Sequence, residues 1–378
     1  MGTTPSACRL GTLLLAACAA AAAADPGLPA LLPDEAARIV AHGPWPPPVA
    51  RDPSNRASGN AAAIGFGRRL FHEPRFSVNG YVACVTCHQT DRAYTDAIAR
   101  GRGLAPGERN TPTVLNAAFS PHLGWTGNSD SLWMASLRPL LDAHEMASSA
   151  ARVAHVVRIG DGLACEYRRA FGRSPAGLGD ETVMVDVAKA LAAFQETLVT
   201  GRTTFDDVRD TLAQTPGGEA GPALQTTGYP AAAWRGVLLF VGRAGCARCH
   251  AGAHFTDGSL RAVAAMAVPP AEPGRYSLHG PFNDAAHSAR TGAHAAALPG
   301  VQPPERSGGI KVPGLRNVAV TAPYLHDGSL DTLQQAVRHS GARIDEAEVD
   351  DLVAFLQTLT DAEGAKRALQ RPGDSTCR

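Results

Sequence analysis

Apolar residues recur every three or four positions in two long segments of the chain, and this spacing predicts amphipathic helices. Asp180 is placed to cap the first helix, and Asp345 with Glu348 forms a capping box for the second. The apolar positions are Val183, Val187, Leu191, Phe194 and Leu198 in the first helix, and Val349, Leu352, Val353, Leu356 and Leu359 in the second. Because no run of alternating strands appears, the sequence predicts an all-α fold.

Two stretches of the chain carry the same signals in the same order. Each has an apolar helix ending in Phe, then a Cys-x-x-Cys-His sequence, then an aromatic-Thr-Asp triplet. The first spans residues 65–96 and the second residues 234–257. Such a repeat predicts two similar structural units, which we place at 61–202 and 203–362.

The remaining segments are predicted to be irregular or removed. Residues 1–24 resemble an export signal, with Arg9 before a short, Ala-rich apolar run. Cys18 follows Leu-Ala-Ala as in a lipobox, so a lipid anchor at Cys18 and simple cleavage before Asp25 are both open. Either route leads out of the cytoplasm, and we expect the periplasm. The other irregular segments are an extended leader at 25–60, a linker at 201–228, a long loop over the second Cys-x-x-Cys-His site at 269–309, and a tail at 363–378.

Charge and cysteine content narrow the function. Lys plus Arg and Asp plus Glu are both 35, so net charge gives no reason to expect a nucleic-acid partner. Of eight cysteines, two lie in the signal and four in the repeated motifs. Cys165 and Cys377 are left over, and they form a disulfide or stay unpaired, because sequence does not give their separation.

The Cys-x-x-Cys-His sequences predict two covalently bound c-type haems. Two thiols bond to the haem vinyl groups while the adjoining His ligates the iron. The attachment residues are Cys84, Cys87 and His88 in the first unit, and Cys246, Cys249 and His250 in the second. Zinc is the competing interpretation, but it normally requires two Cys-x-x-Cys units much closer in sequence.

Several further motifs resemble the di-haem cytochrome c peroxidase and MauG family over nearly the whole mature chain. They are Leu70–Phe76, Arg109–Asn116, Trp125, Asp130–Trp133, Glu145–Met146, Lys311–Asn317 and Thr321–Gly328. The resemblance implies two cytochrome c-like domains with long irregular loops. The haem on His88 would react with hydrogen peroxide, and the haem on His250 would transfer electrons.

The resemblance also implies roles for individual residues. Glu145 matches the family's distal acid, which shuttles a proton of bound peroxide. Trp125 matches the tryptophan between the haems, an electron or hole relay. Asn110, with the carbonyls of Thr321 and Pro323, matches an inter-haem calcium site.

Three departures from the family pattern alter these expectations. Residues 101–107 contain no His, whereas the peroxidases carry a blocking His there, so we expect an open first haem. Ala135 replaces a distal Gln, and Trp133 is expected to fill that space. Ser340 stands where the second haem usually has Met or Tyr; His339 is therefore the preferred distal iron ligand, with His326 or a five-coordinate iron as alternatives.

Three functions follow from these implications. A peroxidase would take electrons from a small cytochrome c or cupredoxin. A MauG-like enzyme would use peroxide to oxidise side chains of a partner protein. A carrier would transfer electrons without catalysis, and Glu145 argues against it. A membrane is expected as a partner only through the lipid anchor.

Overall fold

The computed structural model describes residues 31–215, 227–261, 274–285, 309–367 and 377. In this part of the chain the fold is helical apart from one antiparallel ribbon, β1 Leu260–Arg261 with β2 Ile310–Lys311. The predicted helix-rich fold is therefore confirmed. No helix in the described ranges is long and apolar enough to cross a membrane.

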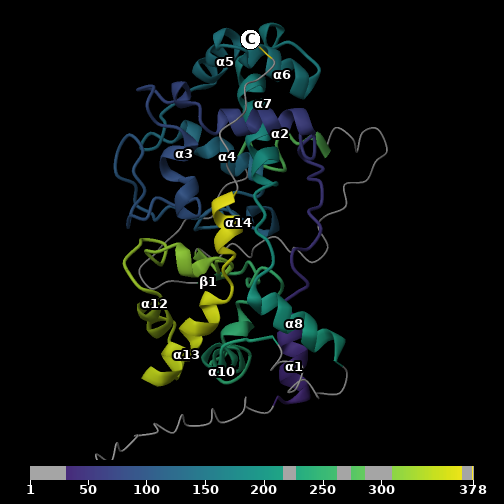
Figure 1. Cartoon of the computed structure of the whole chain (residues 1–378). Coiled ribbons are helices and arrows are strands. Elements are labelled where there is room, and N and C mark those ends of the chain that lie inside the picture. Colours follow the sequence, from purple (N-terminus) through teal and green to yellow (C-terminus); the bar gives the residue numbers. More distant parts are fainter. Residues whose placement is uncertain (1–30, 216–226, 262–273, 286–308, 368–376, 378) are drawn as a thin grey trace, which may run out of the picture.

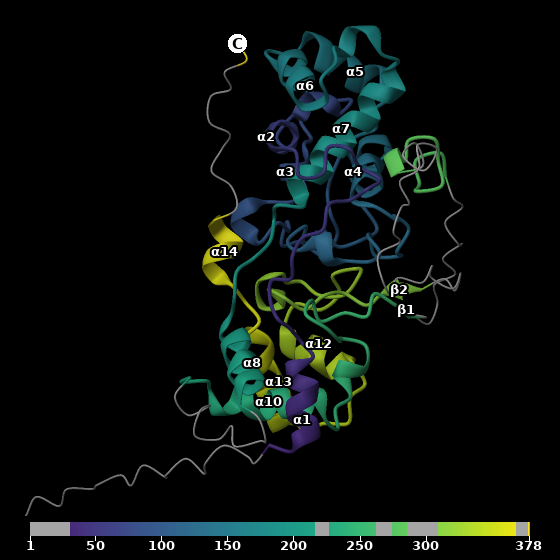
Figure 2. The same ribbon diagram turned by 90° about the vertical axis from the view of Figure 1, so that its right-hand side faces the viewer.

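The helices gather into two halves, one above the other in Figures 1 and 2. The upper half contains α2 Ala61–Leu70, α3 Cys84–Cys87, α4 Leu132–Leu141, α5 Ala150–Ile159, α6 Leu163–Phe171 and α7 Asp180–Gln195. The lower half contains α1 Pro33–Val40, α8 Thr204–Gln214, α10 Ala231–Val241, α12 Leu333–His339 and α13 Glu346–Gln357, while α14 Ala362–Arg367 lies between the halves.

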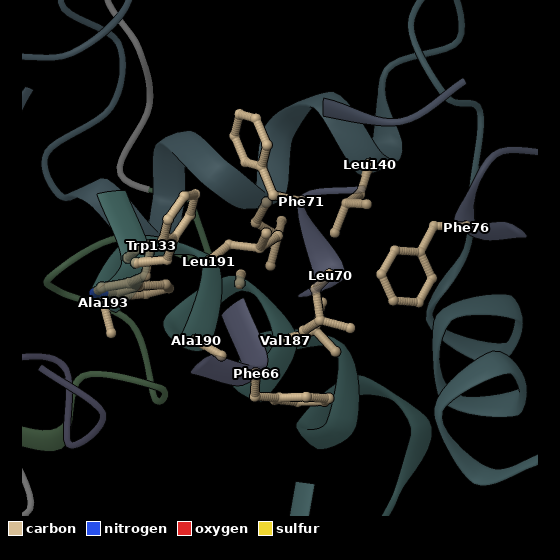
Figure 3. Close-up of a cluster of buried hydrophobic side chains, with 14 of the residues drawn as sticks. Phe66, Leu70, Phe71, Phe76, Trp133, Leu140, Val187, Ala190, Leu191 and Ala193 are labelled. Carbon is tan, nitrogen blue, oxygen red and sulfur yellow. The ribbon is translucent and has the colours of Figure 1, made fainter. Parts of the chain in front are cut away.

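The upper half has its own hydrophobic core around the crossing of α2 and α7. Figure 3 shows Phe66 and Leu70 of α2, with the adjoining Phe71, near Val187 and Leu191 of α7. Nearly every residue of α7 is buried, as expected of a helix surrounded by other helices.

The lower half repeats this arrangement with α10 and α13, around a second core. The same close approach occurs in both halves. A Cβ atom on Gly67 of α2 would overlap the carbonyl oxygen of Ala190 in α7, and one on Gly236 of α10 would overlap that of Asp351 in α13. Glycine thus lets both helix pairs cross closely.

The halves also meet through reciprocal contacts. Gly127 of the upper half approaches Leu260 of the lower, and Gly328 of the lower half approaches Ala99 of the upper. The two glycines hold equivalent positions. Gly127 lies two residues before Ser129, which forms an isolated β-bridge with Leu123, and Gly328 lies two residues before Leu330, which forms the same kind of bridge with Tyr324. The repeated units are therefore related by an approximate two-fold at their junction.

The predicted helix caps are confirmed in one case and corrected in the other. Asp345 accepts from the Glu348 N–H at 3.0 Å, and Glu348 accepts from the Asp345 N–H at 3.0 Å, as a capping box requires. The other helix begins at Asp180 itself, with Gly179 at the cap position. The Asp180 carboxylate pairs instead with Arg158 at 2.6 Å.

Two segments predicted to be irregular contain helices. Within the leader, residues 33–40 form α1, whose Ile39 is buried in the lower core. Within the linker, residues 204–214 form α8, because Phe205, Val208 and Leu212 complete that same core. Short runs flanked by Pro and Gly hid both helices.

Residues 274–285 correct the predicted loop over the second site, because they pack on the upper half. Asp284 pairs with the buried Lys189 of α7 at 2.6 Å, and Arg275 pairs with Glu181 at 2.5 Å. Tyr276 stacks on Phe282 beside the upper core. The rest of that loop, the export signal with Cys18, and most of the tail lie outside the described residues.

Cys377 is described, and it forms a disulfide with Cys165 of α6, with the Cα atoms 5.8 Å apart. This result decides between the two alternatives that the sequence left open.

Candidate functional site

Both Cys-x-x-Cys-His sequences form one short helical turn. The His88 N–H donates to the Cys84 carbonyl at 2.9 Å, and the His250 N–H donates to the Cys246 carbonyl at 2.9 Å. All four motif cysteines are half-buried, and none of them forms a disulfide. Each turn therefore brings two thiols and one imidazole together.

Each imidazole is held by a backbone carbonyl. Nδ1 of His88 lies 3.1 Å from the Tyr94 oxygen, and Nδ1 of His250 lies 3.1 Å from the Phe255 oxygen. Tyr94 and Phe255 both adopt positive φ, 60° and 56°, which turns these carbonyls back toward the rings. Because Nδ1 must donate to the carbonyl, Nε2 keeps its lone pair for a metal ion.

Electrostatics favour the same ligand state. Burial is the main cause that lowers the pKa of both His88 and His250, so both rings are neutral near pH 7. The sequence singled out the aromatic-Thr-Asp triplets only as a repeat; their aromatic residues supply the carbonyls that orient the ligands.

These residues fit a covalently attached haem better than zinc. Each turn offers two thiols and one imidazole, whereas a structural zinc site needs four ligands, with its cysteines as thiolates. Within the described ranges, no three His, Cys, Asp or Glu side chains are grouped to hold a metal ion. A thioether bond to a vinyl group needs no thiolate in the product.

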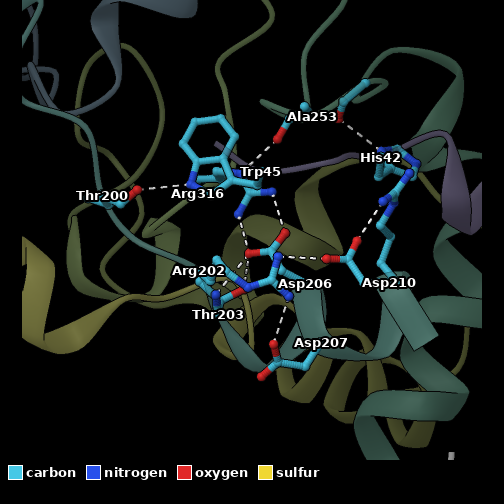
Figure 4. A network of polar contacts seen from close by, with 12 residues as sticks. His42, Trp45, Thr200, Arg202, Thr203, Asp206, Asp207, Asp210, Ala253 and Arg316 are labelled. Atoms are coloured by element: carbon cyan, nitrogen blue, oxygen red, sulfur yellow. Dashed lines mark hydrogen bonds and ion pairs between the residues drawn. The ribbon is translucent and has the colours of Figure 1, made fainter. Parts of the chain in front are cut away.

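The loop around the second imidazole is braced by a buried polar network (Figure 4). Arg316 forms a two-bonded ion pair with Asp206 and donates to the Ala253 carbonyl at 2.7 Å. Its guanidinium lies 3.8 Å from the centre of the Trp45 ring. His42 binds the Gly252 carbonyl at 3.2 Å. The leader and α8 thus fix the loop that follows His250.

Glu145 lies close to the first attachment turn. Its negative charge contributes to raising the pKa of both Cys84 and Cys87. Glu145 is exposed to solvent, and its pKa is nevertheless raised, first by desolvation of the carboxyl and then by the charge of Asp142.

The loop at 101–107 is fixed beside Glu145. The Leu104 N–H donates to the Glu145 carbonyl at 3.1 Å, and the Ala105 N–H donates to the His144 carbonyl at 3.0 Å. The Arg102 carbonyl accepts from the Cys87 thiol at 3.6 Å. This loop therefore joins the attachment turn to the Glu145 segment.

Trp125 and Asn110 lie at the junction of the halves. The Trp125 indole N–H donates to the Asn110 carbonyl at 2.8 Å. The Asn110 N–H donates to the His326 carbonyl at 2.9 Å, and the Lys311 N–H donates to the Trp125 carbonyl at 2.8 Å. Trp125 is half-buried there.

The predicted calcium ligands lie on two segments that meet where the Asn110 N–H donates to the His326 carbonyl. The Asn110 side chain donates to the Ile98 carbonyl at 3.0 Å, and Thr321 and Pro323 are half-buried on the segment leading to His326. The calcium site stays a prediction.

The distal side of the second site also stays a prediction. His339 ends α12 and is exposed, and no hydrogen bond or ring contact among the described residues joins it to His250. Trp133, expected near Glu145, is fully buried in the upper core, where its indole N–H donates to the Ser54 hydroxyl at 3.0 Å. The structure therefore explains Trp133 as a core residue.

Comparisons with known proteins agree with this geometry. Residues 61–213 match the family model described as di-haem cytochrome c peroxidase. The methylamine utilization protein MauG of Methylorubrum extorquens is 32% identical over 82% of this chain and 81% of its own length. The cytochrome c551 peroxidase of Nitrosomonas europaea is 30% identical over 80% of each chain.

Solved structures show the same fold. A MauG-like protein associated with microbial copper homeostasis matches with a TM-score of 0.59 at 24% identity, covering 85% of this chain and 97% of its own. The diheme peroxidase BthA from Burkholderia thailandensis matches with a TM-score of 0.58 at 21% identity, covering 82% and 89%.

Proposed function

The chain belongs to the di-haem cytochrome c peroxidase family, and on this premise we propose that it is an exported oxidoreductase that reduces hydrogen peroxide at its first haem site. Cys84, Cys87 and His88 would hold the reactive haem, and Cys246, Cys249 and His250 the second one. Bound haem supplies the iron chemistry and accepts electrons; the protein orients its ligands and moves protons.

The observation that carries this proposal is the asymmetry around two equally built attachment turns. Both imidazoles are held by a carbonyl at 3.1 Å. Beside the first turn, the loop at 101–107 is bonded both to the Cys87 thiol and to the Glu145 backbone. Burial raises the pKa of Cys84 and Cys87, and the charge of Glu145 adds to both shifts. A partly desolvated carboxylate can accept a proton from peroxide and return it to the leaving oxygen.

Trp125 is proposed to connect the two sites electronically. Its indole donates to Asn110 of the upper half, and its own carbonyl accepts from Lys311 of the lower half. A π system bonded to segments of both halves is suitably placed for electron exchange between them.

Export to the periplasm is part of the proposal, and the Cys165–Cys377 disulfide supports an oxidising compartment. A small redox protein would supply electrons at the second site. Calcium at Asn110, Thr321 and Pro323, and His339 as distal ligand of the second iron, belong to the same proposal.

A second candidate is a MauG-like activity, in which peroxide-derived oxidising equivalents act on side chains of a partner protein. The loop at 101–107 favours it, because this loop contains no His and is bonded along its backbone to residues 144 and 145. Without a His in this loop, the first haem would need no rearrangement before it reacts with peroxide.

Stopped-flow mixing of the oxidised, haem-loaded protein with peroxide tests both candidates. Turnover that requires reduced cytochrome c supports the peroxidase. A long-lived product with near-infrared absorption supports the MauG-like enzyme. Glu145→Gln should slow the peroxide reaction by roughly 10²–10⁴-fold, with Glu181→Gln, a surface carboxylate paired with Arg275, as control. If peroxide causes no spectral change in the parent protein, both catalytic candidates are refuted and electron transfer without catalysis remains.

A further inference from the structure

Lys311 places a positive charge at the junction of the halves, and the described residues supply no acidic partner for it. It is half-buried in β2, and among the described residues it forms no ion pair. Lys189 of α7, by contrast, is buried and pairs with Asp284 at 2.6 Å. Even partial burial of an ammonium without a counter-charge is unfavourable, so a native fold normally supplies an anion.

Two histidines share the neighbourhood of this ammonium. The charge of Lys311 lowers the pKa of His122, from the upper half, and of His254, from the lower half. Desolvation is the larger cause for both rings and lowers the pKa of His254 to about 3. Nδ1 of His254 is buried and has no hydrogen-bond partner in the described part of the chain. The charge of Asp130 raises the pKa of His122 and partly offsets these effects there, whereas no acidic group in the described part of the chain raises the pKa of His254.

The segments that carry Lys311 and His254 are the ones that hold His250. The Val312 N–H, next to Lys311, donates to the Ser259 carbonyl at 2.9 Å, on the segment that follows His250. His254 lies in the turn between His250 and Phe255, whose carbonyl binds Nδ1 of His250. The Thr256 hydroxyl donates to the Val312 carbonyl at 2.6 Å and ties these segments together.

We propose that Lys311, together with His254, binds a carboxylate group of the haem attached to Cys246, Cys249 and His250. The inference rests on the proposed function, because it presupposes that haem. Haem carries two propionate carboxylates, which are the acceptors that an unpaired ammonium and an unsatisfied imidazole nitrogen lack. Lys311 is then a positioning residue that also sets the charge beside the second iron.

The approximate two-fold sharpens the assignment. Asn110 of the upper half and Lys311 of the lower half make the reciprocal backbone bonds, to His326 and to Trp125. The upper half has a neutral amide at this place and the lower half an ammonium. The charge is therefore specific to the second site.

Redox titration of the haem-loaded protein tests the inference. An ammonium beside the haem favours the reduced iron, so Lys311→Met should lower at least one of the two midpoint potentials, and Lys311→Arg should stay near the parent value. Glu305→Gln is the control, since Glu305 is the nearest acidic residue along the chain before Lys311. It should leave both potentials unchanged.

Haem content, measured on the same samples, separates this inference from the proposed function. A parent protein without two covalent haems would refute the proposed function itself. Two haems in Lys311→Met with both potentials unchanged would overturn the role of Lys311, as would a shift in Glu305→Gln equal to that in Lys311→Met. Loss of haem in Lys311→Met but not in Lys311→Arg would support it; equal loss in both would refute it.

Discussion

The crossing of α2 and α7 gives a stability prediction with a control on the same helix. A methyl group at Gly67 would overlap the Ala190 carbonyl oxygen and would contact Cβ of Phe194 at 3.0 Å. Gly65, half a turn earlier, is exposed, and a methyl group added there would have no other atom within 4 Å. Gly67→Ala and Gly65→Ala therefore add the same atom to a closed and to an open position.

The magnitude follows from two opposing effects. Replacing Gly by Ala inside a helix favours folding by about 1 kcal/mol in both variants. Overpacking against a backbone atom that cannot move aside costs about 1–3 kcal/mol, and only Gly67→Ala incurs it. The free energies of unfolding of the two variants should therefore differ by about 1–3 kcal/mol, with Gly65→Ala the more stable.

Denaturant unfolding of the haem-loaded variants, followed by circular dichroism, measures this difference. A second readout is the haem spectrum, because α2 leads into Phe71, whose ring centre lies 6.3 Å from that of His88. Widening of the crossing should disturb the first haem and not the second. Equal stability of the two variants would show that the helices do not cross as closely as described.

Three further predictions concern other parts of the chain. Removing the disulfide with Cys165→Ser and Cys377→Ser opens a link across 212 residues and should lower the free energy of unfolding by up to about 5 kcal/mol, measured with denaturant; unchanged stability would contradict it. Glu145 must be ionised to accept a proton, so the rate constant for the reaction with peroxide should rise as pH passes through the raised pKa of Glu145. Asp142 raises this pKa and Arg138 lowers it. Asp142→Asn should therefore move the rise to lower pH, and Arg138→Gln should move it to higher pH. Burial raises the pKa of Glu196 from 4.5 to about 7, so the folded state retains a proton that the unfolded chain loses, and stability should fall as pH rises through this range; Glu196→Gln should flatten this pH dependence, and an unaltered slope would assign it to other groups.

Local signals predicted the parts of the fold that depend on near neighbours in sequence. The capping box at Asp345 and the two attachment turns need only residues within a few positions of each other. By contrast, α1 and α8 are short, and their helical form depends on Ile39 and Phe205 reaching a core built by residues far along the chain. The packing of residues 274–285 on the upper half depends on Asp284 meeting Lys189, which no local pattern encodes.

The candidate site divides in the same way. Cysteine spacing predicted the attachment residues, whereas the carbonyls of Tyr94 and Phe255 are backbone groups that leave little trace in residue identity. Lys311 begins one of the family motifs, but the sequence assigned it no role, since a single lysine in a Pro- and Gly-rich segment is ordinary. That the described residues give it no ion pair appears only in three dimensions.

The approximate two-fold explains how two similar units can do different work. The same hydrogen bond to the backbone occurs in both halves. The Asn116 side chain accepts from the Thr200 N–H at 2.9 Å, and the Asn317 side chain accepts from the Asp361 N–H at 3.0 Å. Since the backbone treats both imidazoles alike, a difference in reactivity between the two irons must come from side chains. The side chains that break the symmetry are those to which the proposals assign roles: Glu145 beside the first turn, and Lys311 in place of Asn110 beside the second.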